Sequence, residues 1–229
     1  MMAMKNSCAN LFQKITLLLL PLTVLAVAAC STSAQGQVPA YAGPSNVSAV
    51  TGKQTAVLAG GCFWGVDAVF KHVKGAEKVV SGYSGGSAGS AEYETVSSGS
   101  TGHAESVEIT YDPSQVRFSE LLRIFFSVAT DPTQLNRQGP DVGTQYRSVI
   151  FYSGEDQKQI AQGYIDQLNQ AGAFSRPIVT QVVSFKAFYP AEAYHQNFLA
   201  RHPNYPYIVF NDLPKLRTLK KQFPEFYRK

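Results

Sequence analysis

The stretch TAVLAGGCFWGVDAVFKHV, residues 55–73, places a strand signal, two glycines, a cysteine and a helix signal in direct succession. Residues 55–59 form an apolar, strand-like run, and residues 66–73 have the apolar spacing of an amphipathic helix. The glycines before Cys62 allow the backbone to turn tightly between the two elements. The sequence therefore predicts Cys62 at a helix N-terminus, where unpaired N–H groups and the helix dipole stabilise a thiolate.

Position alone leaves two interpretations of Cys62. A free cysteine packs as a small hydrophobic residue, so one interpretation is a buried structural side chain without reactivity. The flanking glycines and the aromatic residues Phe63 and Trp64 favour the other interpretation, a reactive thiol beside an apolar surface.

The first 29 residues have the pattern of a secretory signal peptide. Lys5 and Lys14 form a basic region without acidic residues, and residues 15–29 are an apolar run interrupted only by two threonines and a proline. This run is shorter than the roughly 20 residues of a membrane span and fits the apolar core of a signal peptide. Its end, Val27-Ala28-Ala29-Cys30, resembles the bacterial lipobox, which implies cleavage before Cys30 and a lipid on the Cys30 sulfur.

A lipid on Cys30 would anchor the protein to a bacterial membrane, facing the periplasm or the cell surface. Ser31 in place of Asp favours the outer membrane if the cell is Gram-negative. An ordinary signal peptide with soluble release is the alternative. Residues 30–53 are small, polar and contain Pro and Gly, so they are expected to form a flexible tether. Such a coil would reach on the order of 25–30 Å.

Residues 54–229 have the length of one domain with a sizeable core. Loss of Lys5 and Lys14 would lower the net charge from +4 to +2, which gives no sign of nucleic-acid binding. With one thiol left in this part of an exported chain, no internal disulfide framework is expected. We expect the domain to be a monomer.

Strand and helix signals alternate along this domain and predict an α+β fold, with helices against a mixed or antiparallel sheet. Ser119 is expected to cap one helix and Gly172 to end another. Long irregular stretches remain at 84–104, 130–147 and 200–213, and such loops are usually functional. The strand signals lie at 55–59, 78–83, 107–111, 148–152 and 178–185, and the helix signals at 66–73, 120–129, 155–171, 191–199 and 214–222.

Several general classes of site are excluded or weakened. His103-Ala104-Glu105 matches half of the zinc deaminase signature, but the Pro-Cys-x-x-Cys half is absent. The four histidines lack the close spacing of a metal site, and no phosphate loop or dinucleotide fingerprint is present. A Cys/His hydrolase, with His195 or His103 as the base, stays open.

Five segments, in collinear order across residues 55–210, together resemble the methionine sulfoxide reductase A family. The resemblance implies a two-layer α/β plait with a ferredoxin-like core, long functional loops and an irregular C-terminal region. It implies thiol-dependent reduction of the S-epimer of methionine sulfoxide, in proteins or free, as repair after oxidative damage. The segments are Gly61-Cys62-Phe63-Trp64-Gly65, Gly82-Tyr83-Ser84-Gly85-Gly86, Tyr93 through Glu105, Asn136-Arg137-Gln138-Gly139 with Asp141 and Gln145-Tyr146-Arg147-Ser148, and Glu192 with Tyr194-His195-Gln196.

The resemblance assigns catalytic roles that suit the chemistry of these residues. Cys62 would be the nucleophile. Glu105 would donate a proton, because a carboxyl beside a thiol in an apolar pocket has a raised pKa. Tyr93 and Tyr146 would hydrogen-bond the sulfoxide oxygen, and Asp141 would hold water or the tyrosines.

The resemblance also assigns substrate binding. Phe63 and Trp64 would form an apolar cup for the ε-methyl group of the substrate, next to Gly61. His195 would orient its loop rather than react.

The chain departs from many relatives in one respect, since it lacks the resolving cysteine that they carry at the position of Gly65 or Ser97, or near the C-terminus. The Cys62 sulfenic acid would then be resolved by an external thiol through a mixed disulfide. That thiol would be a thioredoxin-like protein fed by a membrane-linked donor, or dithiothreitol in vitro. No bound cofactor or metal is expected.

Two other functions stay open at this stage. One keeps the reactive thiol but changes the reaction, to a thiol peroxidase or an acyl-transfer enzyme. The other is a non-catalytic surface lipoprotein that binds a partner with its aromatic groove and has an inert Cys62.

Overall fold

The computed structural model describes residues 36–44 and 52–229, so the expected signal peptide and Cys30 lie outside the described residues. The elements alternate much as the sequence predicts, and the expected α+β class is confirmed. The strands are β1 (Gln54–Gly60), β2 (Ala76–Ser84), β3 (Ala104–Tyr111), β4 (Arg137–Gln138), β5 (Asp141–Val142), β6 (Ser148–Tyr152), β7 (Gln181–Ser184) and β8 (Phe188–Pro190). The α-helices are α1 (Phe63–Lys71), α2 (Tyr93–Val96), α3 (Phe118–Ile124), α4 (Glu155–Gln170), α5 (Phe198–Arg201) and α6 (Leu213–Gln222).

Shorter helical turns complete these elements. A π-helical turn, η2 (Phe125–Ala129), extends α3, and a second, η4 (Ile208–Asp212), leads into α6. Two 3₁₀ turns, η1 (Ala88–Ser90) and η3 (Thr144–Tyr146), lie in the long loops.

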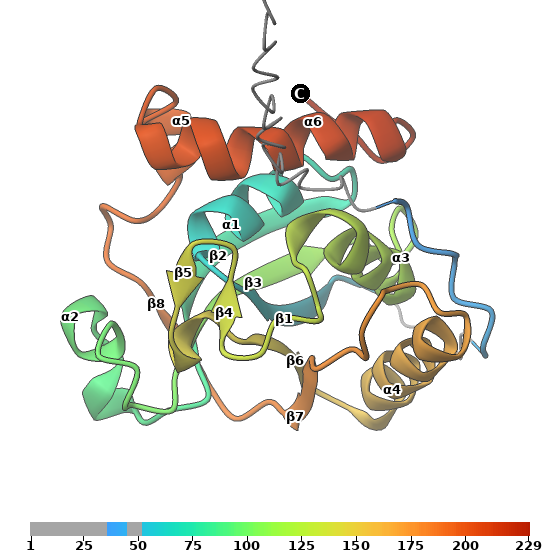
Figure 1. Ribbon diagram of the computed structural model, residues 1–229, viewed down its shortest axis with the longest axis horizontal. Helices are drawn as coiled ribbons and strands as arrows, with labels where there is room; N and C mark the ends of the chain where they lie inside the picture. Colours follow the sequence, from blue (N-terminus) through green and yellow to red (C-terminus); the bar gives the residue numbers. More distant parts are fainter. Residues whose placement is uncertain (1–35, 45–51) are drawn as a thin grey trace, which may run out of the picture. The chain divides into compact units, whose positions relative to one another are not determined.

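Six strands form one sheet in the order β7-β6-β1-β3-β2-β8. All neighbours pair antiparallel except β6 and β7, which are parallel. The connection from β1 to β2 contains α1, and the one from β3 to β6 contains α3; both helices lie above the sheet in the view of Figure 1. A second sheet is the small hairpin of β4 and β5.

Strand β1 is buried on both faces, which explains its continuous apolar run. Ala56 and Leu58 point into the larger core cluster together with the helices. Val57 and Ala59, which point the other way, pack in a smaller cluster that contains Phe151. Because successive side chains of a strand alternate between faces, this central strand needs apolar residues at every position.

Helix α3 begins two residues earlier than the sequence signals predict. The expected cap, Ser119, lies inside the helix and is buried. Arg117 caps the helix instead, and the Glu120 Oε2 atom accepts its backbone N–H at 2.7 Å. This bond satisfies an N–H that the helix itself leaves unpaired, and the Arg117 Nη2 atom also donates to Glu120 Oε1 at 2.9 Å.

The C-terminal region differs from the expectation in two places. Residues 193–197 form turns rather than the expected helix, and α5 begins only at Phe198. The expected irregular stretch at 200–213 is wrong for residues 208–213, because η4 leads directly into α6, whose helix was expected from residue 214. Pro214 lies in the first turn of α6, where no intrahelical N–H bond is needed. Across the described ranges, no helix combines the length and the hydrophobicity needed to cross a membrane.

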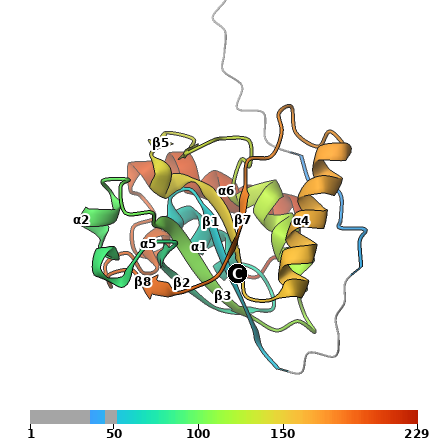
Figure 2. The same ribbon diagram turned by 90° about the horizontal axis from the view of Figure 1, so that it is seen from below.

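Residues 37–42, here called the N-terminal strap, are bound to the domain. Val38 is buried at 3% exposure, and its backbone N–H and C=O bond to Ser127 Oγ and Arg123 Nε at 3.0 and 2.9 Å. Further along the strap, the Tyr164 hydroxyl donates to the Pro39 carbonyl. The strap runs beside α4 in both views (Figures 1 and 2).

The expectation of a flexible tether through residues 30–53 is therefore wrong for this part of it. Composition alone indicates too little apolar surface for independent order. The strap obtains its order from the domain, because Val38 joins the large core cluster and Tyr41 packs against the Tyr164 ring at 5.6 Å. Gln167 bonds to the backbone at both Ala40 and Ala42.

Val38→Ala is expected to lower the free energy of unfolding by about 1–3 kcal/mol, because it removes buried methyl groups and leaves a cavity. Ala40→Ser, at an exposed strap position, is the matched control and should stay within about 0.5 kcal/mol. Urea unfolding of the chain from Ser31 measures both. Equal stability of the two variants would show that the buried Val38 side chain contributes nothing to the free energy of unfolding.

Candidate active site

Cys62 is the N-terminal cap residue of α1, as predicted, and its side chain is only 8% exposed. The preceding Gly61 has φ of +95°, a backbone conformation that favours glycine. A Cβ atom at that position would also lie 2.5 Å from the Gln138 side chain. The tight turn between β1 and α1 therefore depends on Gly61 and fixes the direction of the Cys62 side chain.

Glu105 lies in the middle of the site on β3 and is 3% exposed. Its Oε2 atom accepts the backbone N–H of Phe63, the residue after Cys62, at 2.9 Å. Burial raises the pKa of Glu105 to about 8, although the Phe63 N–H opposes the shift. At neutral pH the carboxyl therefore holds a proton beside the thiol, which is the state that proton donation requires.

The Cys62 thiol differs from the expectation. Burial raises its pKa well above the usual value, and the negative charges of Glu105 and Asp212 add to the rise. The backbone N–H of Trp64 lowers the pKa, as a helix N-terminus does, but this effect is smaller than desolvation. The predicted thiolate is therefore wrong for the unliganded protein, where Cys62 is a neutral thiol at pH 7.

Tyr93 and Tyr146 come from two separate loops and meet at the same site. Tyr93 begins α2, and Tyr146 ends η3. Burial raises the pKa of each phenol, and the charges of Glu105 and Cys62 raise it further. Both hydroxyls therefore stay protonated at neutral pH and can donate hydrogen bonds into the site.

Asp141 is positioned by a residue that the sequence motifs do not include. Its Oδ2 atom accepts a hydrogen bond from the Tyr207 hydroxyl, on the segment just before η4. Asp141 thus binds a tyrosine, as expected, but not one of the two that the sequence pattern indicates. Burial raises the pKa of Asp141, and the Tyr207 bond and the charge of Lys215 oppose the rise.

Trp64 is half-buried and is held on two sides. Its ring stacks on Phe198 with centroids 3.7 Å apart, and its indole Nε1 donates to His195 Nδ1 at 3.1 Å. Phe63, by contrast, is 1% exposed and packs in the core against His195 and Tyr83. Of the two expected cup residues, Trp64 has the more open face.

His195 positions its neighbours. It is buried, and burial lowers its pKa, so the ring is neutral at pH 7. Because Nδ1 accepts the Trp64 bond, the ring proton is on Nε2, 3.9 Å from Glu192 Oε2. This agrees with an orienting role.

Glu192 is a further site residue whose function the sequence analysis did not assign, although it lies within a quoted motif. One carboxylate oxygen accepts the Tyr93 backbone N–H at 2.8 Å, and the other accepts the Tyr83 hydroxyl at 2.9 Å. Glu192 therefore fixes the start of α2 against β2. It positions Tyr93 without belonging to the reacting centre.

The geometry disfavours the hydrolase and does not provide a metal site. Both ring nitrogens of His103 bond to backbone groups, of Gly86 and Ser87, so this histidine is not free to act as a base for Cys62. Within residues 36–44 and 52–229, no group of three or more His, Cys, Asp or Glu side chains is arranged to hold a metal ion.

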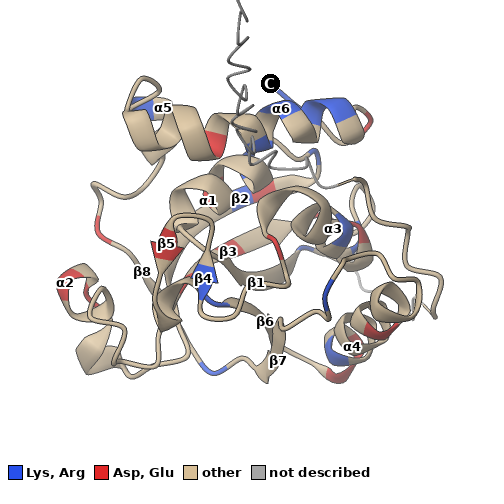
Figure 3. Cartoon of the chain, in the orientation of Figure 1, with Lys and Arg blue, Asp and Glu red and all other residues tan. Residues whose placement is uncertain are grey.

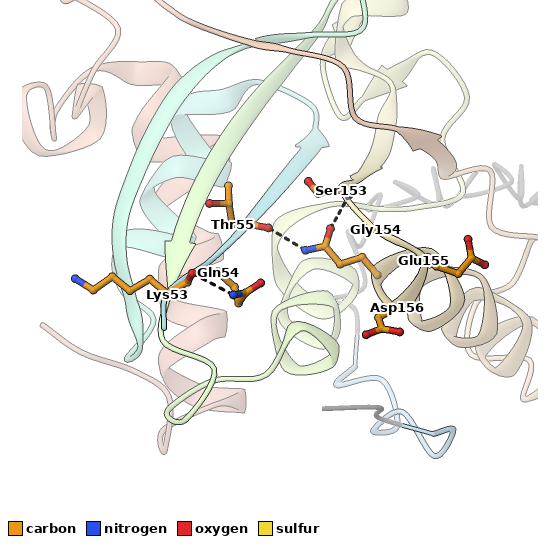
Figure 4. Close-up of a pocket in the computed structure, with 8 residues that line it drawn as sticks. Lys53, Gln54, Thr55, Ser153, Gly154, Glu155 and Asp156 are labelled. Carbon is orange, nitrogen blue, oxygen red and sulfur yellow. Dashed lines mark hydrogen bonds between the residues drawn. The ribbon is translucent and has the colours of Figure 1, made fainter. Parts of the chain in front are cut away.

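A shallow hollow of about 550 Å³ lies between the start of β1 and the N-terminus of α4 (Figure 4). Gln157 crosses it, donating to the Thr55 carbonyl and accepting from the Ser153 N–H, both at 2.9 Å. Cys62 follows the other end of β1. None of the predicted site residues lines this hollow, so it is not the active site.

Asp212 lies against the first turn of α1 and is completely buried. A Cβ atom at Gly65 would collide with Asp212 Oδ1 and lie 2.8 Å from Lys215 Nζ. Burial raises the pKa of Asp212 to about 6, and Lys215, 3.6 Å away, opposes the shift. The carboxylate therefore occupies the space that any side chain at position 65 would need.

The sequence of residues 54–226 matches the family Peptide methionine sulfoxide reductase. The chain is 63% identical over 179 residues to a peptide methionine sulfoxide reductase of Mesorhizobium japonicum, covering 78% of this chain and 92% of that protein. It is 56% identical over 174 residues to one of Synechocystis sp., covering 76% and 81%. The chain belongs to the peptide methionine sulfoxide reductase A family.

A solved structure supports the same assignment. The structure of methionine sulfoxide reductase A of Corynebacterium diphtheriae is similar with a TM-score of 0.58 at 36% identity, covering 67% of this chain and 76% of that one. Members of the methionine sulfoxide reductase A family are oxidoreductases. Membership favours a reductase over the thiol peroxidase, the acyl-transfer enzyme and the non-catalytic binding lipoprotein.

Gly65→Ala is expected to destabilise the protein by about 1–3 kcal/mol, because the new methyl group meets the buried Asp212 carboxylate. Gly89→Ala is the control, since nothing lies within 4 Å of its added Cβ. In the double variant Gly65→Ala/Asp212→Ala the penalty of the Gly65 change should shrink. Urea unfolding of the unchanged chain, Gly65→Ala, Asp212→Ala and the double variant gives the coupling energy, and strictly additive effects would contradict the predicted contact.

Proposed function

We propose that this chain reduces the S-epimer of methionine sulfoxide to methionine, in proteins or free, and so repairs oxidised proteins. The observation that carries the proposal is the buried, protonated Glu105 carboxyl bonded to the N–H of the residue that follows Cys62. It places an acid and a sulfur nucleophile side by side in a site of little exposure. Sulfoxide reduction needs both, because oxygen must gain a proton as sulfur is attacked.

The first half-reaction uses groups that the fold brings together. Glu105 protonates the sulfoxide oxygen, and the hydroxyls of Tyr93 and Tyr146 donate hydrogen bonds to it. The Cys62 sulfur attacks the substrate sulfur, and the thiol proton passes to Glu105. The oxygen ends on Cys62 as a sulfenic acid. The substrate sulfur gains two electrons and Cys62 loses two.

The high pKa of the Cys62 thiol fits this order of events. A neutral thiol and a protonated carboxyl carry one proton each, and the site releases neither to solvent before substrate binds. Protonation of the oxygen makes the substrate sulfur more electrophilic and leaves Glu105 negative. Glu105 can then accept the thiol proton as the sulfur–sulfur contact forms, so the pair acts as a unit.

Substrate binding is assigned to the aromatic side of the site. We infer that the open face of Trp64 contacts the ε-methyl group, with Phe63 as the buried base of the cup. Gly61, at the turn before Cys62, lets the backbone approach the substrate. His195 and Phe198 hold the Trp64 ring in one orientation, and Asp141 with Tyr207 borders the site.

An external thiol is proposed to complete the cycle. Cys62 is the free cysteine of the described residues, and the whole sequence has only Cys8 and Cys30 besides. A thiol attacks the Cys62 sulfenic acid, water leaves and a mixed disulfide forms. A second thiol releases Cys62 and a disulfide, so two thiols are oxidised for each methionine formed. The donor would be a thioredoxin-like protein, and no prosthetic group takes part.

We also infer that the core is the two-layer α/β plait that the family resemblance implies. The four central strands in the order β6-β1-β3-β2, with α1 and α3 in the connections, support it. The expectation that the domain is a monomer stays a prediction.

The test is turnover of a synthetic peptide that carries separated sulfoxide epimers, with dithiothreitol as the thiol. Only the S-epimer should be consumed, and Cys62→Ser should abolish the reaction. Without reductant, one methionine should form per chain, together with a Cys62 sulfenic acid seen by mass spectrometry. Consumption of neither epimer by a folded protein whose Cys62 can be alkylated would refute the proposal.

The same single-turnover assay tests the proton donor. Glu105 is protonated below about pH 8, so the rate should fall as pH rises through that value. Glu105→Gln should slow the step about 10²–10⁴-fold and remove the break near pH 8. Glu108→Gln, on the same strand, is the control and should keep both rate and profile. An unchanged profile in Glu105→Gln would assign the break to another group.

We propose export and a lipid anchor at Cys30, on a bacterial membrane facing the periplasm or cell surface. The support is the signal-like residues 1–29 and the lipobox-like sequence before Cys30. Radiolabelled palmitate should be incorporated by the full chain and not by Cys30→Ser. If neither the full chain nor Cys30→Ser incorporated palmitate, an ordinary signal peptide with soluble release would be favoured.

A further inference from the structure

One face of the helical segment 208–222 is exposed and carries an aromatic residue followed by cations. This face, here called the basic stripe, consists of Phe210, Arg217, Lys220 and Lys221. Arg217 lies seven residues after Phe210, and Lys220 and Lys221 lie three and four residues after Arg217, which places all four on the same side of the segment. Phe210 is 77% exposed, and the three cations are also exposed. Leu219 and Phe223, on the other side, are buried in the core.

The charge of the basic stripe is not balanced by its own helix. Helix α6 has the sequence LPKLRTLKKQ, which contains four cations and no acidic residue. Figure 3 shows these cations along α6. Lys74 is a further exposed cation next to it, since its Nζ atom donates to the Glu225 carbonyl beyond the helix. Asp212, just before α6, is buried and directed toward α1.

This concentration of charge stands out against the rest of the protein. Without Lys5 and Lys14 the chain has a net charge of only +2. Other faces carry mixed charges, for example α4 with Glu155, Asp156 and Lys158. An overall field is therefore weak, and the attraction to a negative partner is local to α6.

The N-terminal strap leads to the same helix. The Gln37 side chain donates to the carbonyl of Gln222, the last residue of α6, at 2.9 Å. Gln37 lies seven positions after Cys30, and a fully extended chain of that length spans at most about 25 Å. A lipid on Cys30 would therefore be confined to this distance from the strap, whatever the path between them.

We propose that the basic stripe lies on an anionic phospholipid surface and orients the anchored enzyme. Arg217, Lys220 and Lys221 meet the phosphate head groups, and Phe210 enters the interface. Exposed cations on one helix face, next to an exposed aromatic ring, are the pattern by which peripheral helices bind such surfaces.

The proposal adds to the lipid anchor but does not depend on it for its test. Residues 34–229 form one compact unit with its own core, so the chain from Ser31 to Lys229 without a lipid is the protein to use. It is mixed with vesicles of phosphatidylcholine alone or with phosphatidylglycerol. Binding is measured by co-sedimentation at low and at high salt.

The chain should bind the phosphatidylglycerol vesicles, and not those of phosphatidylcholine, and high salt should release it. Each basic residue near an anionic surface strengthens partitioning about fivefold, so the variant Arg217→Glu/Lys221→Glu should bind at least about 25-fold more weakly. Lys220 is left unchanged, because its ammonium lies over the Tyr227 ring. The variant should reduce soluble sulfoxide peptide at the unchanged rate, which shows that it is folded.

Lys158→Glu/Lys186→Glu is the matched control, with the same change of net charge. Lys158 is on α4, and Lys186 follows β7. The labels of α4 and β7 are at the bottom of Figure 1, and that of α6 is at the top. The control variant should bind the vesicles as the unchanged chain does, within about twofold. Equal losses of binding in both variants would show that net charge, and not the basic stripe, determines vesicle binding. Absence of vesicle binding, or binding only to a soluble polyphosphate or to a second copy of the chain, would overturn the proposal.

Discussion

The site depends on the burial of one carboxyl group. Glu105 is held between the sheet and the N-terminus of α1, where only the Phe63 N–H compensates for its lost hydration. Desolvation is therefore the larger effect on the pKa of Glu105 and keeps the group protonated at neutral pH. The same shift weakens the fold as pH rises from about 4.3, the unfolded value, to about 8, because the folded state binds the proton more tightly. The protein gives up stability to keep an acid beside Cys62.

Burial, followed by the carboxylates around Cys62, explains why its position at a helix N-terminus does not produce a thiolate. Glu105, Asp212 and Asp141 all oppose a negative sulfur, and burial opposes it more strongly still. The backbone N–H of Trp64, at the helix end, acts in the other direction but is weaker. A sequence pattern shows the helix end, whereas the opposing charges come from β3, β5 and η4.

The contrast between the local helix end at Cys62 and the charges from distant elements shows how far the sequence could predict the structure. Local signals were sufficient for β1, for the turn at Gly61 and for the cap position of Cys62, because neighbouring residues determine them. Strand β6 and helix α6 also follow their apolar patterns closely. The pairing of Asp141 with Tyr207 joins residues 66 positions apart, and no local pattern encodes such a contact. The strap was missed for the same reason, since its polar composition conceals that Val38 fills a site on α3 and η2.

Asp212 connects the chemistry of this chain to its missing second thiol. Its carboxylate occupies the place of a side chain at residue 65, so glycine there is a packing requirement and not simply an absent cysteine. A thiol at that position could enter only if the start of α6 moved. The turn that carries Asp212 also begins the segment that bears Arg217 and Lys221. Packing of α6 on α1 thus sets the surroundings of Cys62 on one face of the segment and presents the basic stripe on the other. The first of these supports the proposed resolution of the sulfenic acid by an external thiol.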